Sequence, residues 1–112
     1  WVSLDKAGKF NSMMKFAENS NKELIEHISS PDTPGSSLII PKEKLKSFNW
    51  IQPELNKGDI SIHDGLVVHY SDKNNSSFSR RGFLLNYRPL SCKKNNKKFD
   101  QYLEKLEKIY DR

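Results

Sequence analysis

Short apolar runs separated by turn residues are the feature that most constrains how this chain can fold. The pattern is clearest at Ile60–His63 and Leu66–Ser71, which flank the dipeptide Asp64–Gly65. Asp-Gly between two such runs is typical of a tight β-hairpin. A polar loop follows, and residues 80–87 then form the longest strand-like run. The pattern predicts antiparallel strands rather than parallel β-α-β units.

The remaining chain fits the same class of fold. Trp1–Leu4 is predicted as a strand, and Trp50–Leu55 as an edge strand, because the proline inside it cannot donate a hydrogen bond to a sheet. A short helix is predicted at Lys22–Ile28, a loop at Ser29–Ser37, and an amphipathic helix at Phe99–Tyr110. We therefore expect a mainly β fold, an antiparallel sandwich or jelly roll, with a C-terminal helix.

Composition limits the class of protein. The 112 residues allow at most one domain, and no apolar run reaches the ~20 residues of a membrane span. The single cysteine, Cys92, cannot form an internal disulfide, which fits a reducing compartment such as the cytoplasm. The net charge is +5, and the whole excess lies in residues 80–112. This basic tail could dock on nucleic acid or an acidic partner, but no recognised nucleic-acid motif accompanies it, so we expect a solvated face.

The three histidines differ in what they can do. His27 falls in the predicted first helix and is expected to be structural or at the surface. His63 and Asp64 are adjacent on a strand and face opposite sides, so they cannot jointly hold a metal, and Asp64 is better explained as a turn residue. His69 shares a strand face with Ser71. It is either a core histidine or part of a polar pocket.

The paired arginines supply context for His69. Along one strand Arg80 and Gly82 share a face, and Arg81 lies on the other. Gly82 leaves space beside Arg80. If that face is interior, the guanidinium needs an anionic partner, and a carboxylate of a small dicarboxylic ligand would provide one. The alternative is that both arginines begin a strand in solvent.

These residues resemble the C-terminal motif block of the phytanoyl-CoA dioxygenase family, which comprises Fe(II)- and 2-oxoglutarate-dependent oxygenases with a double-stranded β-helix. Upstream, Trp1–Asp5 is similar to the family's Trp-x-x-Leu-Asp strand, and Asn11–Met14 to its Asn-Gly-x-Leu. The resemblance covers residues 1 to about 90. The matching positions in the distal block are Gly58-Asp59, His69-Tyr70-Ser71, Asn74, Ser76, Arg80-Arg81 and Tyr87.

The resemblance implies a role for each matching residue. His69 would be the distal histidine of the two-histidine, one-carboxylate iron site. Arg80 would anchor the distal carboxylate of 2-oxoglutarate with Ser71 as a helper, and Trp1 would border the cosubstrate. With Fe(II), 2-oxoglutarate and O2, the complete protein is expected to hydroxylate an aliphatic C–H bond of a small organic substrate.

The chain departs from the family pattern at three places. The His-x-Asp that supplies the other two iron ligands should lie shortly before Trp1, so we expect a C-terminal fragment of a longer protein that is inactive alone. Tyr70 replaces the usual glycine after the histidine, and Asn19–Asn21 replaces most of a Gly-Ser-His turn. The last two departures suggest an altered substrate.

The predicted organisation has two parts. Residues 1–91 are expected to form a partial double-stranded β-helix, and residues 92–112 a basic linker and helix. The terminal helix could also pair two copies into a homo-oligomer. A non-catalytic jelly-roll binding module that has lost its metal site is the alternative to the enzyme, and a His-x-Asp before Trp1 would favour the enzyme.

Overall fold

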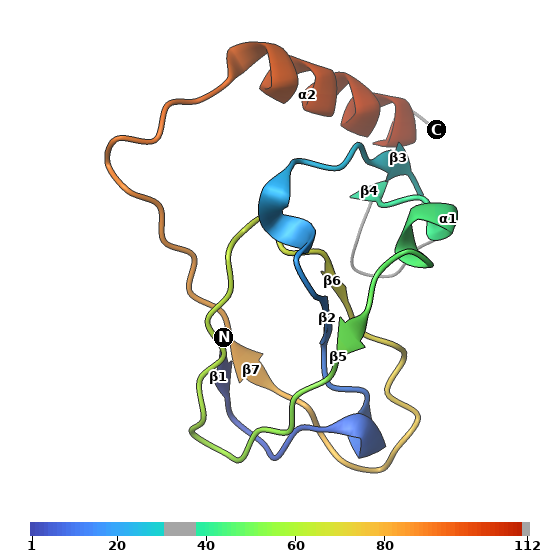
Figure 1. The fold of residues 1–112 in the computed structure, drawn as a ribbon, viewed down its shortest axis with the longest axis vertical. Helices are drawn as coiled ribbons and strands as arrows, with labels where there is room; N and C mark the ends of the chain where they lie inside the picture. Colours follow the sequence, from blue (N-terminus) through green and yellow to red (C-terminus); the bar gives the residue numbers. More distant parts are fainter. Residues whose placement is uncertain (31–37, 111–112) are drawn as a thin grey trace. The chain divides into compact units, whose positions relative to one another are not determined.

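The computed structural model describes residues 1–30 and 38–110 (Figure 1). The chain forms two compact units, Trp1–Leu24 with Ser47–Asn86, and Ile25–Lys46 with Tyr87–Arg112. In the described part of the chain, no helix has the length and apolar character needed to cross a membrane. The predicted division at residues 91 and 92 stays a prediction, because compactness within this chain does not define the domains of a protein.

The first unit is built from two small antiparallel sheets and two single-turn 3-10 helices. One sheet has two strands, and the other has three with β2 at its centre, in the order β5-β2-β6. The elements are β1 (Val2–Ser3), η1 (Lys9–Asn11), β2 (Lys15–Ala17), η2 (Ser20–Lys22), β5 (Trp50–Ile51), β6 (His69–Tyr70) and β7 (Gly82–Phe83).

The Gly58-Asp59 turn holds β1 in place on the side opposite β7. Gly58 has φ +93°, a conformation that favours glycine, and its N–H donates to the carbonyl of Ser3 at 2.7 Å. The Ser3 N–H donates in turn to the carbonyl of Asp59, whose carboxylate accepts from the N–H of Asn56. Since Val2 pairs with Phe83 on the other side, β1 is flanked by both segments.

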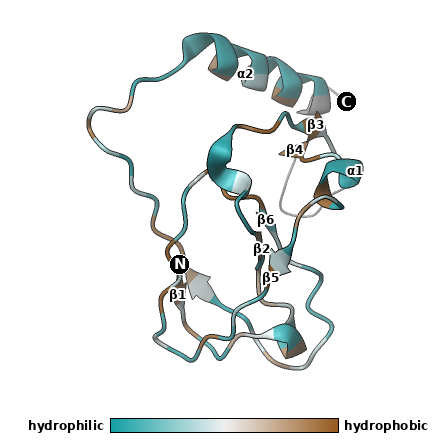
Figure 2. Cartoon of the chain, in the orientation of Figure 1, coloured by the Kyte–Doolittle hydropathy of each residue, from teal (hydrophilic) through white to brown (hydrophobic). Residues whose placement is uncertain are grey.

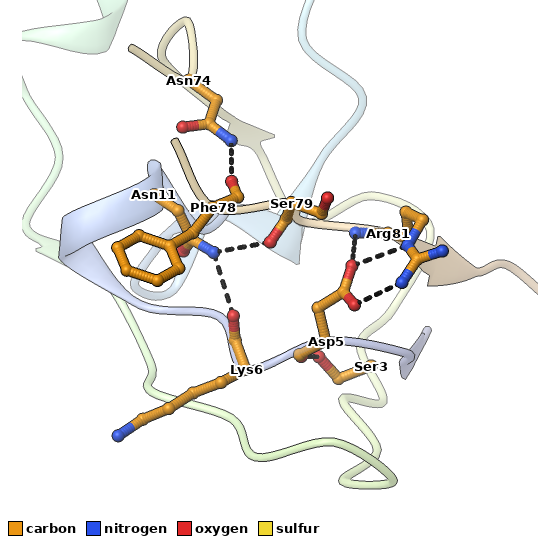
Figure 3. Close-up of polar contacts among 8 residues, drawn as sticks. All are labelled: Ser3, Asp5, Lys6, Asn11, Asn74, Phe78, Ser79 and Arg81. Atoms are coloured by element: carbon orange, nitrogen blue, oxygen red, sulfur yellow. Dashed lines mark hydrogen bonds and ion pairs between the residues drawn. The ribbon is translucent and has the colours of Figure 1, made fainter. Parts of the chain in front are cut away.

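A buried asparagine holds two loops of the first unit together through hydrogen bonds. The Asn11 side chain is fully buried, accepts from the N–H of Gly8, and donates to the carbonyls of Lys6 and Ser79 (Figure 3). The Asn11 amide thus joins η1 to Ser79, which is 68 residues later and immediately precedes Arg80. Ser12, at the position where the family's Asn-Gly-x-Leu motif has glycine, has φ 58°.

The apolar core of the first unit is small and centres on β2. Phe16 pairs with Ile51 on one side and with His69 on the other, so its ring lies at the middle of the three-stranded sheet. The other buried apolar side chains in the described residues are Ala7, Met13, Ala17 and Val68, of which Ala17 also belongs to β2.

The second unit contains a two-stranded sheet and both α-helices. β3 (Ile28–Ser29) pairs with β4 (Leu38–Ile39), and α1 (Lys42–Leu45) follows. The long helix α2 (Asn96–Tyr110) contacts β3, and Lys105 donates to the carbonyl of His27. Hydrophobic positions recur along an otherwise hydrophilic α2 (Figure 2).

The mainly β character and the C-terminal helix are confirmed, whereas the predicted helix at Lys22–Ile28 is wrong. The chain there forms η2 and then β3. The Ser20 hydroxyl donates to the carbonyl of Ala17 and accepts from the N–H of Val68, and Ile28 pairs with Ile39. The partners distant in sequence, Val68 for Ser20 and Ile39 for Ile28, outweigh a weak helical propensity.

The predicted hairpin and long strand are also shorter than expected. Asp64 does make the predicted turn, because its carbonyl accepts from Val67 and its carboxylate from Leu66. The second run, however, pairs through β6 with β2 rather than with the first run. Of residues 80–87 only Gly82–Phe83 is a strand. Most of the loop predicted at residues 29–37 lies outside the described residues.

Candidate functional site

His69 occupies an edge strand beside the central Phe16. Its ring centroid lies 6.1 Å from that of Phe16, and its Nδ1 lies 2.8 Å from the carbonyl oxygen of Val67. A carbonyl only accepts, so the contact places a proton on Nδ1 and leaves the Nε2 of a neutral imidazole with a free lone pair. The side chain is exposed. The Nε2 of His69 is therefore available to coordinate a metal ion.

His63 lies against His69, which the sequence reasoning missed. The two imidazole centroids are 5.2 Å apart, and the His63 ring also packs on Phe16 at 4.8 Å. Burial lowers the pKa of His63, and the nearby His69 and the amino terminus of Trp1 lower it further, which favours the neutral imidazole. Asp64 is a turn residue as predicted, and the neighbour of His63 at the site is His69.

The orientation of this segment could not be read from hydrophobicity. Ile60 is 61% exposed and Ile62 is 93% exposed, while the alternate residues Ser61 and His63 are half-buried. The polar side chains therefore face inward and the apolar ones outward, opposite to the usual pattern of a strand. That reversal marks His63 as a residue of the site rather than of the surface.

Arg80 lies next to Ser71, as the shared-pocket prediction requires. Its Nη2 donates to the Ser71 hydroxyl at 3.3 Å. Its Nε is buried, and no group within the described residues forms a hydrogen bond to it. A buried guanidinium nitrogen without a partner carries an energetic cost, and a ligand oxygen would remove that cost.

Arg81 has a different environment, in which an ion pair engages its side chain. Nη2 lies 2.8 Å and Nε 2.9 Å from the two carboxylate oxygens of Asp5 (Figure 3). The backbone N–H of Arg81 donates to the same carboxylate. The hydrogen bond from the Arg81 side chain lowers the pKa of Asp5 to about 2. The two arginines contact different segments, and of the two only Arg80 has a buried donor without a partner in the described residues.

Trp1 fills the space that was predicted beside Gly82. A Cβ atom on Gly82 would overlap Nε1, Cε2 and Cζ2 of the Trp1 indole. The expected empty space is therefore occupied by an aromatic ring. Because Gly82 is two residues from Arg80, the indole approaches the strand face on which Arg80 was predicted to lie.

The loop between Ser71 and Arg80 is held by its own polar side chains. The Asn74 amide donates to the carbonyl of Phe78 and accepts from the N–H and hydroxyl of Ser76. At the base of the loop, Lys15 and Asp72 form an ion pair of 2.6 Å. These contacts fix the conformation of the loop, at whose ends Ser71 and Arg80 lie next to each other.

Tyr70, which replaces the family's glycine, fits on the sheet without backbone strain. Its φ is not positive, and its ring makes an edge contact with Trp50 at a centroid distance of 4.8 Å. The ammonium of Lys15 lies 5.2 Å from the ring centroid. The substitution therefore adds an aromatic contact between the two edge strands, β6 and β5.

An open hollow of about 690 Å³ lies elsewhere on the first unit. Its lining residues come from the segment after β1 and from the loop after β6, and two of them, Phe10 and Phe78, form an edge-to-face pair. The lining contains Asp5, Lys6, Phe10, Ser77, Phe78 and Ser79. None of the predicted site residues is among them.

The described residues fit an iron site only in part. No three histidine, cysteine, aspartate or glutamate side chains within them come together in a way that could hold a metal ion. His69 offers one imidazole nitrogen of suitable tautomer. Any further ligands would have to come from beyond the described part of the chain.

Comparison with known proteins identifies the family of the chain. The family model of phytanoyl-CoA dioxygenase (PhyH) matches residues 1–82, so the chain belongs to this family. The chain is 29% identical over 109 residues to a 2-aminoethylphosphonate dioxygenase from Uncultured bacterium HF130_AEPn_1. It is 29% identical over 92 residues to a phytanoyl-CoA dioxygenase domain-containing protein 1 homolog from Dictyostelium discoideum.

These relatives are much longer than the chain. The matches cover 96% and 78% of this chain but only 38% and 33% of the two relatives. No solved structure shows significant similarity to the chain. The family membership predicted from the motif block is confirmed.

Proposed function

We propose that the protein to which this chain belongs is an Fe(II)- and 2-oxoglutarate-dependent oxygenase with a double-stranded β-helix. It would use O2 to hydroxylate an aliphatic C–H bond of a small organic substrate. Membership of the phytanoyl-CoA dioxygenase family supports this class of reaction. One relative is named for 2-aminoethylphosphonate, which makes that compound the first substrate to test.

The observation that carries the proposal is the buried Nε of Arg80, which has no hydrogen-bond partner in the described residues. The Nη2 of Arg80 is engaged by Ser71. A carboxylate of 2-oxoglutarate would accept from the guanidinium in the two-pronged geometry that arginine favours. Trp1, seated on Gly82, would border the same ligand and exclude water from it.

His69 would hold the iron through Nε2. The carbonyl of Val67 keeps the proton on Nδ1 and fixes the orientation of the ring, which is how metal-bound histidines are usually oriented. A His-x-Asp outside the described residues would supply the other two ligands. Iron, when bound, supplies the O2 activation that hydroxylation needs.

The test is iron-dependent consumption of 2-oxoglutarate by the full-length protein. His69→Ala should abolish it. His27→Ala is the matched control, because the Nδ1 of His27 also lies 2.8 Å from the carbonyl two residues earlier, yet His27 belongs to the second unit. Unchanged turnover in His69→Ala would contradict the role given to His69.

The non-catalytic binding module remains the competing proposal. It is compatible with the lack, among the described residues, of three side chains that could together hold a metal ion. It predicts that the full-length protein lacks a His-x-Asp before Trp1 and consumes no 2-oxoglutarate with any iron supply.

A further inference from the structure

His63 is a half-buried histidine at the site whose hydrogen-bonding capacity is not used. Its Nδ1 is buried and has no hydrogen-bond partner within the described residues. Within the described residues, the only other buried side-chain nitrogen or oxygen without a hydrogen-bond partner is the Nε of Arg80. Buried polar atoms in folded proteins nearly always have a partner, so each exception requires an explanation.

None of the described groups around His63 makes the missing hydrogen bond. Phe16, on which the ring packs, has no polar atom. The Nδ1 of His69 is directed at the carbonyl of Val67, and its Nε2 is the nitrogen that would hold the iron in the proposed function. The carboxylate of the adjacent Asp64 accepts from the N–H of Leu66 in the turn.

The position of His63 points to a ligand as the partner. Its ring meets that of His69 at 5.2 Å with the planes inclined by 61°. Arg80, which carries the other unsatisfied nitrogen, is bonded to Ser71, two residues after His69. The two unused nitrogens thus belong to side chains that neighbour the same short segment, and a small acid with two carboxylates has oxygens for both.

We propose that His63 is a ligand-binding residue whose Nδ1 forms a hydrogen bond with a carboxylate oxygen of 2-oxoglutarate bound beside His69. The inference rests on the proposed function, since it takes 2-oxoglutarate as the bound acid. It adds a residue that the motif block does not include. Arg80 holds one carboxylate, and His63 orients the other end of the molecule.

The experiment measures the Kd of 2-oxoglutarate by calorimetry on the full-length protein, without oxygen and with Mn²⁺ in place of iron. His63→Phe keeps a ring against Phe16 but removes the nitrogen. Its affinity should fall by about tenfold to a hundredfold, the effect expected for losing a hydrogen bond to a charged oxygen. His63→Asn returns an amide group near the position of Nδ1 and should recover part of the affinity, whereas His63→Gln, whose amide reaches toward the position of Nε2, should not.

Two further measurements keep the outcomes distinct. Melting temperatures of all variants report whether the packing on Phe16 survives. If His63→Phe does not fold, the comparison of His63→Asn with His63→Gln decides, and equal affinities overturn the inference. Wild-type affinity in a folded His63→Phe also overturns it while leaving the proposed function intact. If the wild-type protein itself binds no 2-oxoglutarate, the proposed function fails, and the inference fails with it.

Discussion

Two consecutive arginines have different surroundings. Arg81 is bonded to Asp5 through three hydrogen bonds, and Arg80 is bonded to Ser71 and keeps a buried Nε without a partner in the described residues. The ion pair gives Arg81 a structural role, and the buried donor makes Arg80 the arginine that we propose binds the ligand. Both residues precede β7, and their side chains contact different segments of the chain.

Replacing each arginine with alanine should therefore give opposite effects. Arg80→Ala is expected to weaken 2-oxoglutarate binding at least tenfold, because a charged hydrogen bond to the ligand is lost, and to leave the melting temperature nearly unchanged. Arg81→Ala is expected to lower the melting temperature and leave the Kd of 2-oxoglutarate within about twofold of wild type. Calorimetry and thermal unfolding of both variants check the pair. The same loss of affinity in both would show that Arg80 has no special role.

Asp5 makes stability depend on pH in a defined window. The bonds from Arg81 lower its pKa from the ordinary value of 3.8 to about 2, so the unfolded chain binds a proton more readily than the folded one. The contribution of Asp5 is fully present above about pH 4 and is lost as the pH falls through 2. The partners are unequally exposed, 19% for Asp5 and 73% for Arg81, so salt should weaken the effect.

The measurement is the difference in free energy of unfolding between wild type and Asp5→Asn from pH 7 to pH 2. That difference should be constant above about pH 4 and shrink below it. Titration of the other carboxyl groups cancels in the comparison. A difference that is the same at pH 7 and pH 2 would rule out the ion pair as its cause.

At the scale of elements, the contact between Trp1 and Gly82 joins β1 to β7. The ring occupies the volume that any side chain at position 82 would need. Gly82→Ala should destabilise the protein by about 1–3 kcal/mol, the usual cost of inserting an atom into a packed region. Gly65→Ala is the control, since nothing lies within 4 Å of a Cβ there and its φ is not positive. Urea unfolding of both variants measures the effect, and equal stability would mean that the indole moves aside freely.

The three-stranded sheet shows which element-scale predictions hold. β5 is an edge strand, as the proline at position 53 indicated, and β6 carries His69 as expected. The strand within residues 80–87 is shorter than the alternation of its side chains predicts, because it is limited to Gly82–Phe83. Pairing needs a partner strand, and only Val2 and Ser3 provide one there.

At the scale of the whole molecule, the matched part of the chain covers 38% and 33% of two relatives. Its described residues contain no group of three side chains that could together hold a metal ion. A single imidazole binds a divalent metal far more weakly than three ligands held in place. We therefore expect the chain alone to bind Mn²⁺ or Fe(II) at least a hundredfold more weakly than the full-length protein. Calorimetric titration of both, with His69→Ala of each as the control, measures this. Equal affinities would place the metal ligands within this chain.

Local chemistry allowed several features to be predicted from the sequence alone. The Gly58-Asp59 and Asp64 turns depend on backbone conformations that particular residues favour, and the opposite facing of Arg80 and Arg81 depends on strand parity. The terminal helix depends on a periodic apolar stripe. Family membership followed from the spacing of the motif block and is confirmed over residues 1–82.

Only the tertiary structure decided which side chains meet. His63 reaches His69 because the turn at Asp64 reverses the chain and β6 then pairs with β2. The indole of Trp1 covers Gly82, 81 residues later, and the Ser20 hydroxyl accepts from the N–H of Val68, 48 residues later. Such contacts depend on pairing between distant segments, which no local pattern encodes. Motif and parity select His69 and Arg80, but the fold brings His63 to His69 and Trp1 to Gly82.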